Sequence, residues 1–290
     1  MIELDEGQFK IGNILFGAGT DIKVSTFQKE SYEVQTADLP VARSDEIRFG
    51  RDSFTATAIT FEMSVIDNYS IFEGPEVSIG DYSGSELQEM LATEWRGDKE
   101  RRVWNSQKPL YYCKRGIQKV VYGRPRKFTP GFDRYGSEFI PIVAEYQPVD
   151  PLSYDANEKG VTVGVTVDGV LPGKMVRAGG SVDAWCRFIL NGPINKPVIE
   201  LSTGQKITVN YNLPSGVVME VSSYPWERRV ITSTGYTLAA YLINDSPYLD
   251  EVSLKPNATT SFGLHESGDT KVANADTNLI ALYREAYATL

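Results

Sequence analysis

The chain has 290 residues, of which 41% are hydrophobic and 23% charged, and its formal net charge is −9. This composition is typical of a folded, soluble protein and excludes a disordered chain. The acidic balance argues against a protein that holds DNA or RNA mainly through phosphate contacts, so we expect no sequence-specific nucleic-acid partner. No apolar run approaches the roughly 18 to 20 residues that span a bilayer, and we expect no membrane insertion.

The first residues, MIELDEGQFK, carry three carboxylates where a secretory signal needs a basic segment followed by an apolar one. We therefore expect synthesis and folding in a cytoplasm. Only two cysteines occur, Cys113 and Cys186, and they lie far apart without the spacing of metal ligands. The sequence predicts two buried, reduced thiols, with neither a disulfide framework nor a zinc site.

The N-terminal part predicts strands and turns. The stretch FGAGTD from Phe16 to Asp21 superficially resembles a dinucleotide loop, but it lacks a third glycine and an alternating strand and helix pattern, so it predicts a turn. Residues 57–65 are rich in β-branched side chains and partly alternate, which is typical of a strand. Because Gly50 and the Arg51-Asp52 pair mark a turn before them, we predict a β-hairpin here.

One helix is predicted over residues 84–96, in the stretch DYSGSELQEMLATEWRGD. Its apolar residues recur at helical spacing and form one stripe, which we expect to cover a sheet: Leu87, Met90, Leu91 and Trp95. Two pairs before and within it have capping-box spacing: Ser83 with Glu86, and Ser85 with Gln88. Gly97 is the predicted stop.

A basic segment follows the helix. Between Arg96 and Arg134 there are twelve bases and three acids, a local charge of +9, so the remainder of the chain carries −18. Three strands are expected here, the first two joined at Arg115-Gly116. In the second, Lys119 alternates with Val120, so we expect an exposed basic face opposite an apolar one until Gly123 disturbs the register.

The composition changes in QPVDPLSYDANEKG, which is rich in Pro, Asp and Asn, and this change places a domain boundary near Tyr154. Beyond it, strand-length runs bounded by turn residues recur, as in an antiparallel sandwich or barrel. We predict a mainly β protein with two domains. Residues 1–154 form a barrel-like or sandwich-like β-domain with one helix, and residues 155–290 form a β-sandwich.

The sequence offers little catalytic machinery. His265 is the sole histidine, no Gly-x-Ser-x-Gly elbow accompanies it, and a strand-end histidine is the expected interpretation. Asp269, Asn274 and Asp276 are oxygen ligands without EF-hand spacing, so a polar loop is favoured over a calcium site. We expect no enzymatic activity, metal or cofactor. A glycosidase pair among 38 carboxylates stays open, since sequence alone singles out no pair.

Tyr224 and Trp226, in SSYPWERRV, are candidate platforms for stacking a sugar on a sandwich face. A packed or partly buried tryptophan is the more common outcome for such a residue. We keep both interpretations for this pair.

Several segments together resemble the distal tail protein of long, non-contractile-tailed phages, the siphophages, and in particular the minor tail proteins of phages that infect actinobacteria. The resembling segments, in chain order, are IRFGRDSFTATAITFEM, the helix with EWRGD, VVYGRPRKF, DPLSYD, WCRFILNGPINKPVIEL and LYREAYATL. They extend from about Arg48 to Leu290. The chain departs from the family at Ser153, where an aromatic residue is usual.

The resemblance implies a structural virion protein of the tail tip or baseplate. In that family the N-terminal β-domains close into a hexameric ring, and the second domain is a sandwich similar to galectins or carbohydrate-binding modules. The implied partners are other copies of the chain, the tail tube protein and the hub or tail-associated protein, with the tape-measure protein near the lumen. No catalysis is implied.

A ring can pair a basic edge of one subunit with an acidic edge of the next. We therefore expect subunit or partner contacts at five bases: Arg48, Arg51, Arg124, Arg126 and Lys127. Reversing Arg124 and Arg126 to Glu is expected to impair assembly more than subunit stability. The alternative function is a host-attachment module that binds cell-wall glycan through Tyr224 and Trp226, and a glycan hydrolase is the third hypothesis.

Overall fold

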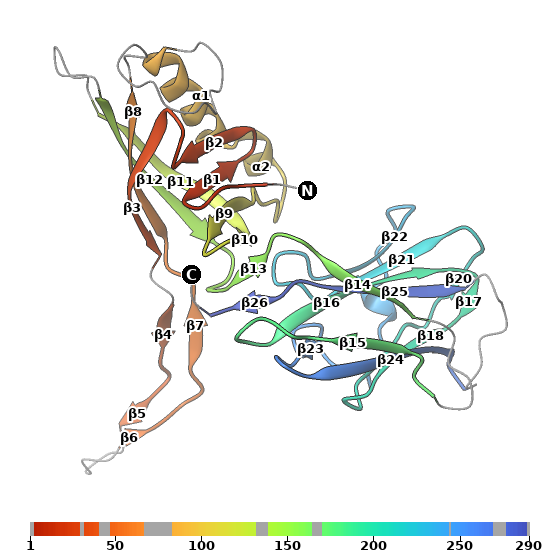
Figure 1. The fold of residues 1–290 in the computed structure, drawn as a ribbon. Coiled ribbons are helices and arrows are strands. Elements are labelled where there is room, and N and C mark those ends of the chain that lie inside the picture. The colour runs from red at the N-terminus through yellow and green to blue at the C-terminus, as the bar shows by residue number, and fades with distance from the viewer. Residues whose placement is uncertain are drawn as a thin grey trace. The chain divides into compact units, whose positions relative to one another are not determined.

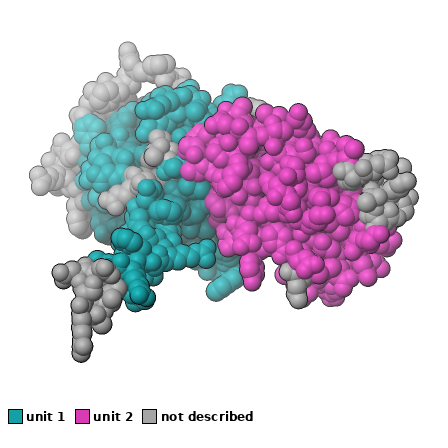
Figure 2. All heavy atoms as spheres, turned by 90° about the horizontal axis from the view of Figure 1, so that it is seen from below, with its two compact units in different colours: residues 1–156, 288–290 teal, residues 157–287 magenta. Residues whose placement is uncertain are grey.

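The computed structural model describes residues 3–29, 32–40, 47–66, 83–131, 139–163, 170–243, 245–268 and 277–288. The chain forms two compact units, which Figure 2 colours separately: unit 1 comprises residues 1–156 and 288–290, and unit 2 comprises residues 157–287. The expected boundary near Tyr154 lies close to this division. The predicted fold class, mainly β with one principal helix, is confirmed. No described helix has both the length and the apolar character needed to cross a bilayer.

Unit 1 contains two antiparallel sheets (Figure 1). The strands of the first, in spatial order, are β2 (Ile14–Gly17), β1 (Gln8–Ile11), β9 (Leu110–Lys114), β10 (Ile117–Val121) and β13 (Ser153–Asp155). Those of the second are β11 (Gly123–Pro130), β12 (Phe139–Pro148), β8 (Ile59–Ile66) and β3 (Ile22–Lys29). Ser153 is fully buried in β13, so this position, usually aromatic in the family that the sequence resembles, is filled here by a small side chain.

The helix α1 (Gly84–Arg96) matches the predicted range, and both of its predicted ends are confirmed. Ser83 forms the capping box with Glu86, and Gly97 closes the helix at a φ of 58°. Leu87, Leu91 and Trp95 are buried, so the apolar stripe does cover a sheet. The Trp95 indole packs edge-on against Phe61, with centroids 5.7 Å apart, and its Nε1 donates a 3.0 Å hydrogen bond to the Glu145 carbonyl. A short helix, α2 (Asp98–Arg102), follows directly.

The hairpin predicted around Gly50 is wrong, because the segment pairs with a more distant part of the chain. β3 pairs with β8, then β4 (Glu33–Gln35) with β7 (Ser53–Thr55), and β5 (Leu39–Pro40) with β6 (Ile47–Arg48). The described strands β3, β4 and β5 therefore run outward, and β6, β7 and β8 run back antiparallel to them. We call the outer part of these strands, β4 to β7, the arm; it projects from the sheets of unit 1 (Figure 1).

At Gly50 the two strands of the arm come close together, because its backbone lies against that of Ala37. The Gly50 amide donates a 3.1 Å hydrogen bond to the Asp38 carboxylate, and a Cβ at this position would lie 2.1 Å from the Ala37 carbonyl oxygen. Only glycine fits such a distance.

The turn predicted at Arg115-Gly116 is confirmed: both residues have positive φ and join β9 to β10. The exposed basic face predicted for the next strand is wrong at Lys119, which is buried together with Val120 and Val121. Burial lowers the pKa of Lys119, and the neighbouring positive charges of Lys114 and Arg115 lower it further. Gly123 does more than disturb the register, because the chain passes there from the first sheet into the second.

Unit 2 is a sandwich of two antiparallel sheets, and Phe188 and Phe262 meet across it edge to face at 5.7 Å. One sheet has the order β14 (Lys159–Val163), β25 (Asn278–Tyr283), β16 (Ala184–Asn191), β21 (Val218–Ser222) and β22 (Arg229–Thr232), and β23 (Ser253–Leu254) also pairs with β16. The other has the order β15 (Gly173–Val176), β24 (Thr259–Glu266), β18 (Pro197–Leu201) and β19 (Lys206–Thr208). The remaining elements are β17 (Ile194–Asn195), β20 (Asn212–Leu213), η1 (Ala239–Tyr241) and β26 (Ala286–Tyr287).

Candidate interaction surface

The arm leaves a row of large apolar side chains in solvent. The exposed residues are Tyr32, just before β4, and Val34, Leu39, Ile47, Phe49 and Phe54. Phe49 is the most exposed of them, at 85%. Tyr32 and Phe54 meet in a T-shaped contact at 4.8 Å, which is the one aromatic contact along this row within the described chain. Arg48 and Arg51, two of the predicted interface bases, are also exposed on the arm.

The other three predicted bases lie on β11 and not on the arm, and no contact among the described residues joins the five. Lys127 is exposed and pairs with Glu145 at 3.5 Å, while Arg126 is exposed and makes no ion pair with any described residue. Arg124 braces the subunit itself, because its Nε donates to the Ser106 carbonyl and its Nη2 to the Val103 carbonyl, the latter at 2.8 Å. Reversing Arg124 would therefore also disturb the subunit, and Arg126 is the cleaner probe of assembly.

Beside Arg126 lies a cavity of about 550 Å³ between the loop that follows α2 and the ends of β11 and β12. It is lined by four arginines, and none of the described residues that line it is acidic. Trp104, at its edge, is 97% exposed. Sequence reasoning missed this residue; the signal was an aromatic side chain set among polar ones immediately after a helix, in RRVWNSQ.

The two candidate sugar-stacking residues are buried in unit 2. Tyr224 is 2% and Trp226 6% exposed, and their rings stack on each other with centroids 4.6 Å apart. The Tyr224 hydroxyl donates a 2.8 Å hydrogen bond to Glu158, and burial together with that carboxylate raises the tyrosine pKa. Neither ring presents an open face, so the expected glycan contact through this pair is corrected to a packing role.

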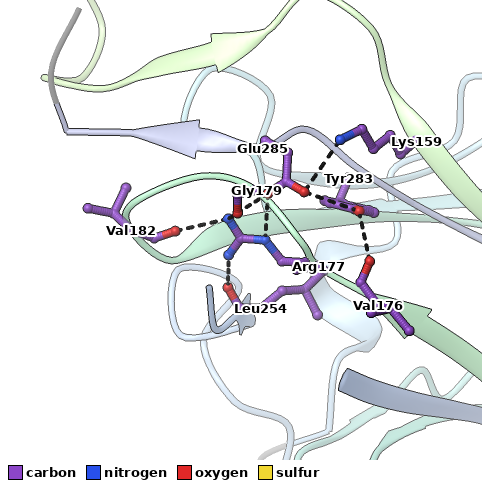
Figure 3. Close-up of polar contacts among 8 residues, drawn as sticks. All are labelled: Lys159, Val176, Arg177, Gly179, Val182, Leu254, Tyr283 and Glu285. Carbon is purple, nitrogen blue, oxygen red and sulfur yellow. Dashed lines mark hydrogen bonds and ion pairs between the residues drawn. The ribbon is translucent and has the colours of Figure 1, made fainter. Parts of the chain in front are cut away.

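Unit 2 also buries an ion pair that the sequence did not reveal (Figure 3). Arg177 and Glu285 are both almost inaccessible, and the Arg177 Nη2 and the Glu285 Oε2 lie 2.9 Å apart. The remaining guanidinium donors go to the carbonyls of Leu254, Gly179 and Val182. These donors bind carbonyls and a carboxylate of the chain itself, so the cluster fixes the fold of unit 2 and offers no group for chemistry.

The remaining candidates for chemistry are scattered. His265 lies at the end of β24, as predicted, with its Nε2 3.5 Å from Glu200 and its Nδ1 3.0 Å from the Glu266 carbonyl. Asp269, Asn274 and Asp276 lie outside the described residues. Within the described residues no three His, Cys, Asp or Glu side chains gather as a metal site would need. Both cysteines are free and buried, as predicted, and burial raises both of their pKa values.

Among the comparisons with known proteins, only the comparison of folds finds similar proteins. No family model matches the sequence, and no curated protein matches it. Among solved structures, the crystal structure of the SPP1 Dit protein, described as a paradigm of the hub adsorption apparatus in phages that infect Gram-positive hosts, aligns with a TM-score of 0.59. The alignment covers 96% of this chain and 98% of SPP1 Dit, at 14% identity.

The chain has the fold of a phage Dit protein. Two structures of the phage P2 baseplate in its activated conformation, one with Ca and one with Sr, also contain this fold. They align with TM-scores of 0.54 and 0.53 at 8% identity, and each alignment covers 98% of this chain and 99% of the matching chain. The Dit fold accounts for both units together, since a match to one unit alone would leave about half of the chain uncovered.

Proposed function

We propose that this protein is a structural component of a phage tail tip, a distal tail protein whose copies form a hexameric ring that joins the tail tube to the tip or baseplate hub. The observation that carries the proposal is the arm of unit 1, whose apolar side chains have no cover within the described chain. The Dit fold, which this chain shares with a hub adsorption protein over nearly its whole length, supports the proposal of a tail-tip role.

The physical argument begins with the row of exposed apolar residues. A soluble subunit that stays alone rarely leaves so many large apolar side chains of one short segment in water, and such a segment marks a contact with another protein. A narrow antiparallel pair also leaves backbone groups on its outer edges, which are ready to pair with a further chain. The arm therefore fits a neighbouring subunit: burying Phe49, Leu39 and Ile47 there removes their surface from water.

The charge of the chain fits a ring of identical copies. Arg48 and Arg51 are exposed on the arm, while the chain as a whole carries −9. When these two exposed arginines meet acidic side chains of the next copy, the charge pairs favour the correct partner and orientation. When the two surfaces in contact differ, the contact repeats head to tail and closes into a ring if the rotation allows it.

In this role the protein acts by assembly and not by catalysis. Its further partners are the tail tube protein on one side of the ring and the hub or tail-associated protein on the other, with the tape-measure protein near the lumen. The protein is made and folded in the host cytoplasm and then resides in the virion tail tip. Its binding partners are proteins, and no sequence-specific nucleic-acid contact is proposed.

The test is the mass of the purified full-length chain, measured by light scattering over increasing concentration and imaged by negative stain. We expect rings of six copies for the unaltered chain. Leu39→Ser combined with Phe49→Ser should leave monomers whose unfolding midpoint is unchanged, because surface substitutions away from packed features alter stability by no more than about 0.5 kcal/mol.

Tyr248→Ser is the matched control, since Tyr248 is a similarly exposed aromatic residue of unit 2 and lies outside the arm. This variant should assemble as the unaltered chain does. An unaltered chain that stays monomeric at every concentration, and that also fails to join purified tube protein, would contradict the ring.

A further inference from the structure

The loop that follows α2 presents a large aromatic side chain to solvent. Trp104 is 97% exposed, and Val103 beside it is also exposed. Tryptophan is usually well buried even when it is not fully inaccessible, so a ring almost wholly in water is an informative exception. Tryptophan and arginine are also the residues that most often carry binding energy at protein interfaces.

Two arginines hold this loop in place. Arg124 donates to the carbonyls of Val103 and Ser106, on either side of Trp104. Arg101 donates from its Nη2 to the Pro125 carbonyl at 2.9 Å, which ties α2 to β11. The loop is thus braced against the sheet of unit 1, and a braced loop loses less conformational freedom on binding than a mobile one.

The cavity beside Trp104 is strongly positive. Arg101, Arg102, Arg124 and Arg126 line it, and no carboxylate is among the described residues that do. Arg101 and Arg124 give donors to backbone carbonyls, which leaves their charge uncompensated. Arg102 and Arg126 make no ion pair within the described chain. This surface therefore fits a partner that offers carboxylates next to an apolar surface for the indole ring.

A second hollow of unit 1 offers that combination. It has a volume of about 470 Å³, lies between α1 and the start of β2, and is lined by Glu86, Glu89 and Glu94 together with the partly buried Met90 and the buried Ile14. Glu86 serves the helix cap and Glu94 pairs with Lys108. Glu89 is exposed and pairs with no described base, so its charge is open to a partner.

We propose that the Trp104 loop of one copy docks into the α1 hollow of a second copy of this chain, with the indole against Met90 and with Arg126 and Arg102 facing Glu89. The inference rests on the proposed ring and names a contact within it. Methionine beside an aromatic ring is a favourable packing partner. Charge complementarity selects the occupant, since the basic cavity and the acidic hollow belong to one unit and carry opposite charge.

The contact is heterologous, because the loop and the hollow are different surfaces of the same subunit. Each copy offers one of each, so the contact repeats from copy to copy and suits a closed ring. It is also distinct from the contact of the arm. A subunit would then be held at two places by its neighbours.

The experiment measures self-association of the full-length chain by sedimentation velocity. Trp104→Ser should weaken association by about tenfold or more, the range expected when a buried interface tryptophan is removed. Arg126→Glu and Glu89→Arg should each weaken it, and the double variant should recover association because the charge pair is restored in reverse. Tyr248→Ser is again the control and should associate normally.

The outcomes separate this inference from the ring itself. Rings that form normally with Trp104→Ser, or a double charge variant no better than its single parents, would overturn the docking contact and leave the ring proposal standing. An unaltered chain that never associates would overturn both. If Trp104→Ser forms rings but no longer joins tube or hub protein, the surface binds another tail protein and the assignment to a second copy is wrong.

Discussion

The two units differ in how they place large apolar and charged side chains. Of the sixteen large apolar side chains exposed in the described chain, twelve belong to unit 1 and four to unit 2. Unit 1 leaves Phe49 and Trp104 in water, while unit 2 places even Arg177 and Glu285 inside, paired with each other. The difference teaches that unit 2 covers most of its large side chains by its own contacts, whereas unit 1 leaves apolar surface that the described chain does not cover.

The largest expected effect breaks the internal pairing of unit 2. Arg177→Met leaves the Glu285 carboxylate buried without its guanidinium and should destabilise unit 2 by about 3–5 kcal/mol, the cost of removing one partner of a buried pair. Urea unfolding of the full-length chain, with hydrogen exchange to localise the loss to unit 2, measures this. Association of the surviving folded chains should be unaffected, because the pair takes no part in the proposed contacts.

The matched control is Lys159→Met. Lys159 lies 3.5 Å from the same carboxylate, but its side chain is 48% exposed, and exposed pairs contribute about 1 kcal/mol or less. If Lys159→Met and Arg177→Met cost the same, burial of the pair is not what stabilises unit 2, and the contrast between the units is weaker than stated.

A smaller effect is expected at Tyr224. Tyr224→Phe removes the hydroxyl that donates to Glu158 while keeping the stack on Trp226. A hydrogen bond to a charged group contributes about 1.5–3 kcal/mol, and we expect the low end of this range because Glu158 keeps its bond to Arg187. The unfolding midpoint of unit 2 measures it. Unchanged stability combined with lost retention on host cell wall would instead revive the glycan-binding hypothesis.

The smallest of these effects concerns the start of α1 in unit 1. Ser83→Ala removes the hydroxyl that accepts a hydrogen bond from the Glu86 backbone amide. We expect it to lower the free energy of unfolding by about 1 kcal/mol. The pKa of Glu86 lies below its usual range, because it accepts hydrogen bonds from the Ser83 amide and hydroxyl. A lowered folded-state pKa gives stability that is present above the unfolded-state pKa and lost as the pH falls through the folded-state value.

The penalty of Ser83→Ala should therefore shrink in acid, where Glu86 is protonated in both proteins. Thermal unfolding at neutral and acidic pH measures the difference. Thr93→Ala is the control, because Thr93 carries an exposed hydroxyl of the same helix away from the cap. A penalty that is independent of pH would show that the carboxylate takes no part in the cap.

Local features of the fold were predictable from sequence, and non-local ones were not. The helix, its cap at Ser83 and its end at Gly97 follow from residues within one turn of each other. The arm was missed because Leu39 pairs with Arg48 and Glu33 with Thr55, and such registers depend on strands that meet from further along the chain. Lys119 was misplaced because strand alternation predicts which face a residue is on, and not whether both faces are covered.

The candidate surface was predictable only in part. The concentration of charge between Arg96 and Arg134 is visible in the sequence, and it does contain the arginines of the cavity. The different roles of these arginines are not visible in the sequence. Arg124 and Arg126 lie two positions apart on one strand, yet Arg124 donates to the loop after α2 while Arg126 is exposed to solvent. The partners Arg177 and Glu285 are separated by 108 positions and are joined only by the folded sandwich.

The place where the chain enters and leaves unit 2 has a consequence for how such a protein can diversify. β14, near the first residues of unit 2, pairs directly with β25, near its last, and Lys159 and Glu285 reach across the same junction. The two ends of the unit are thus neighbours, as is common for domains that tolerate insertion or exchange. The adjacent ends make most of unit 2 a segment that a lineage can exchange for another module with adjacent ends, while unit 1 keeps its own core.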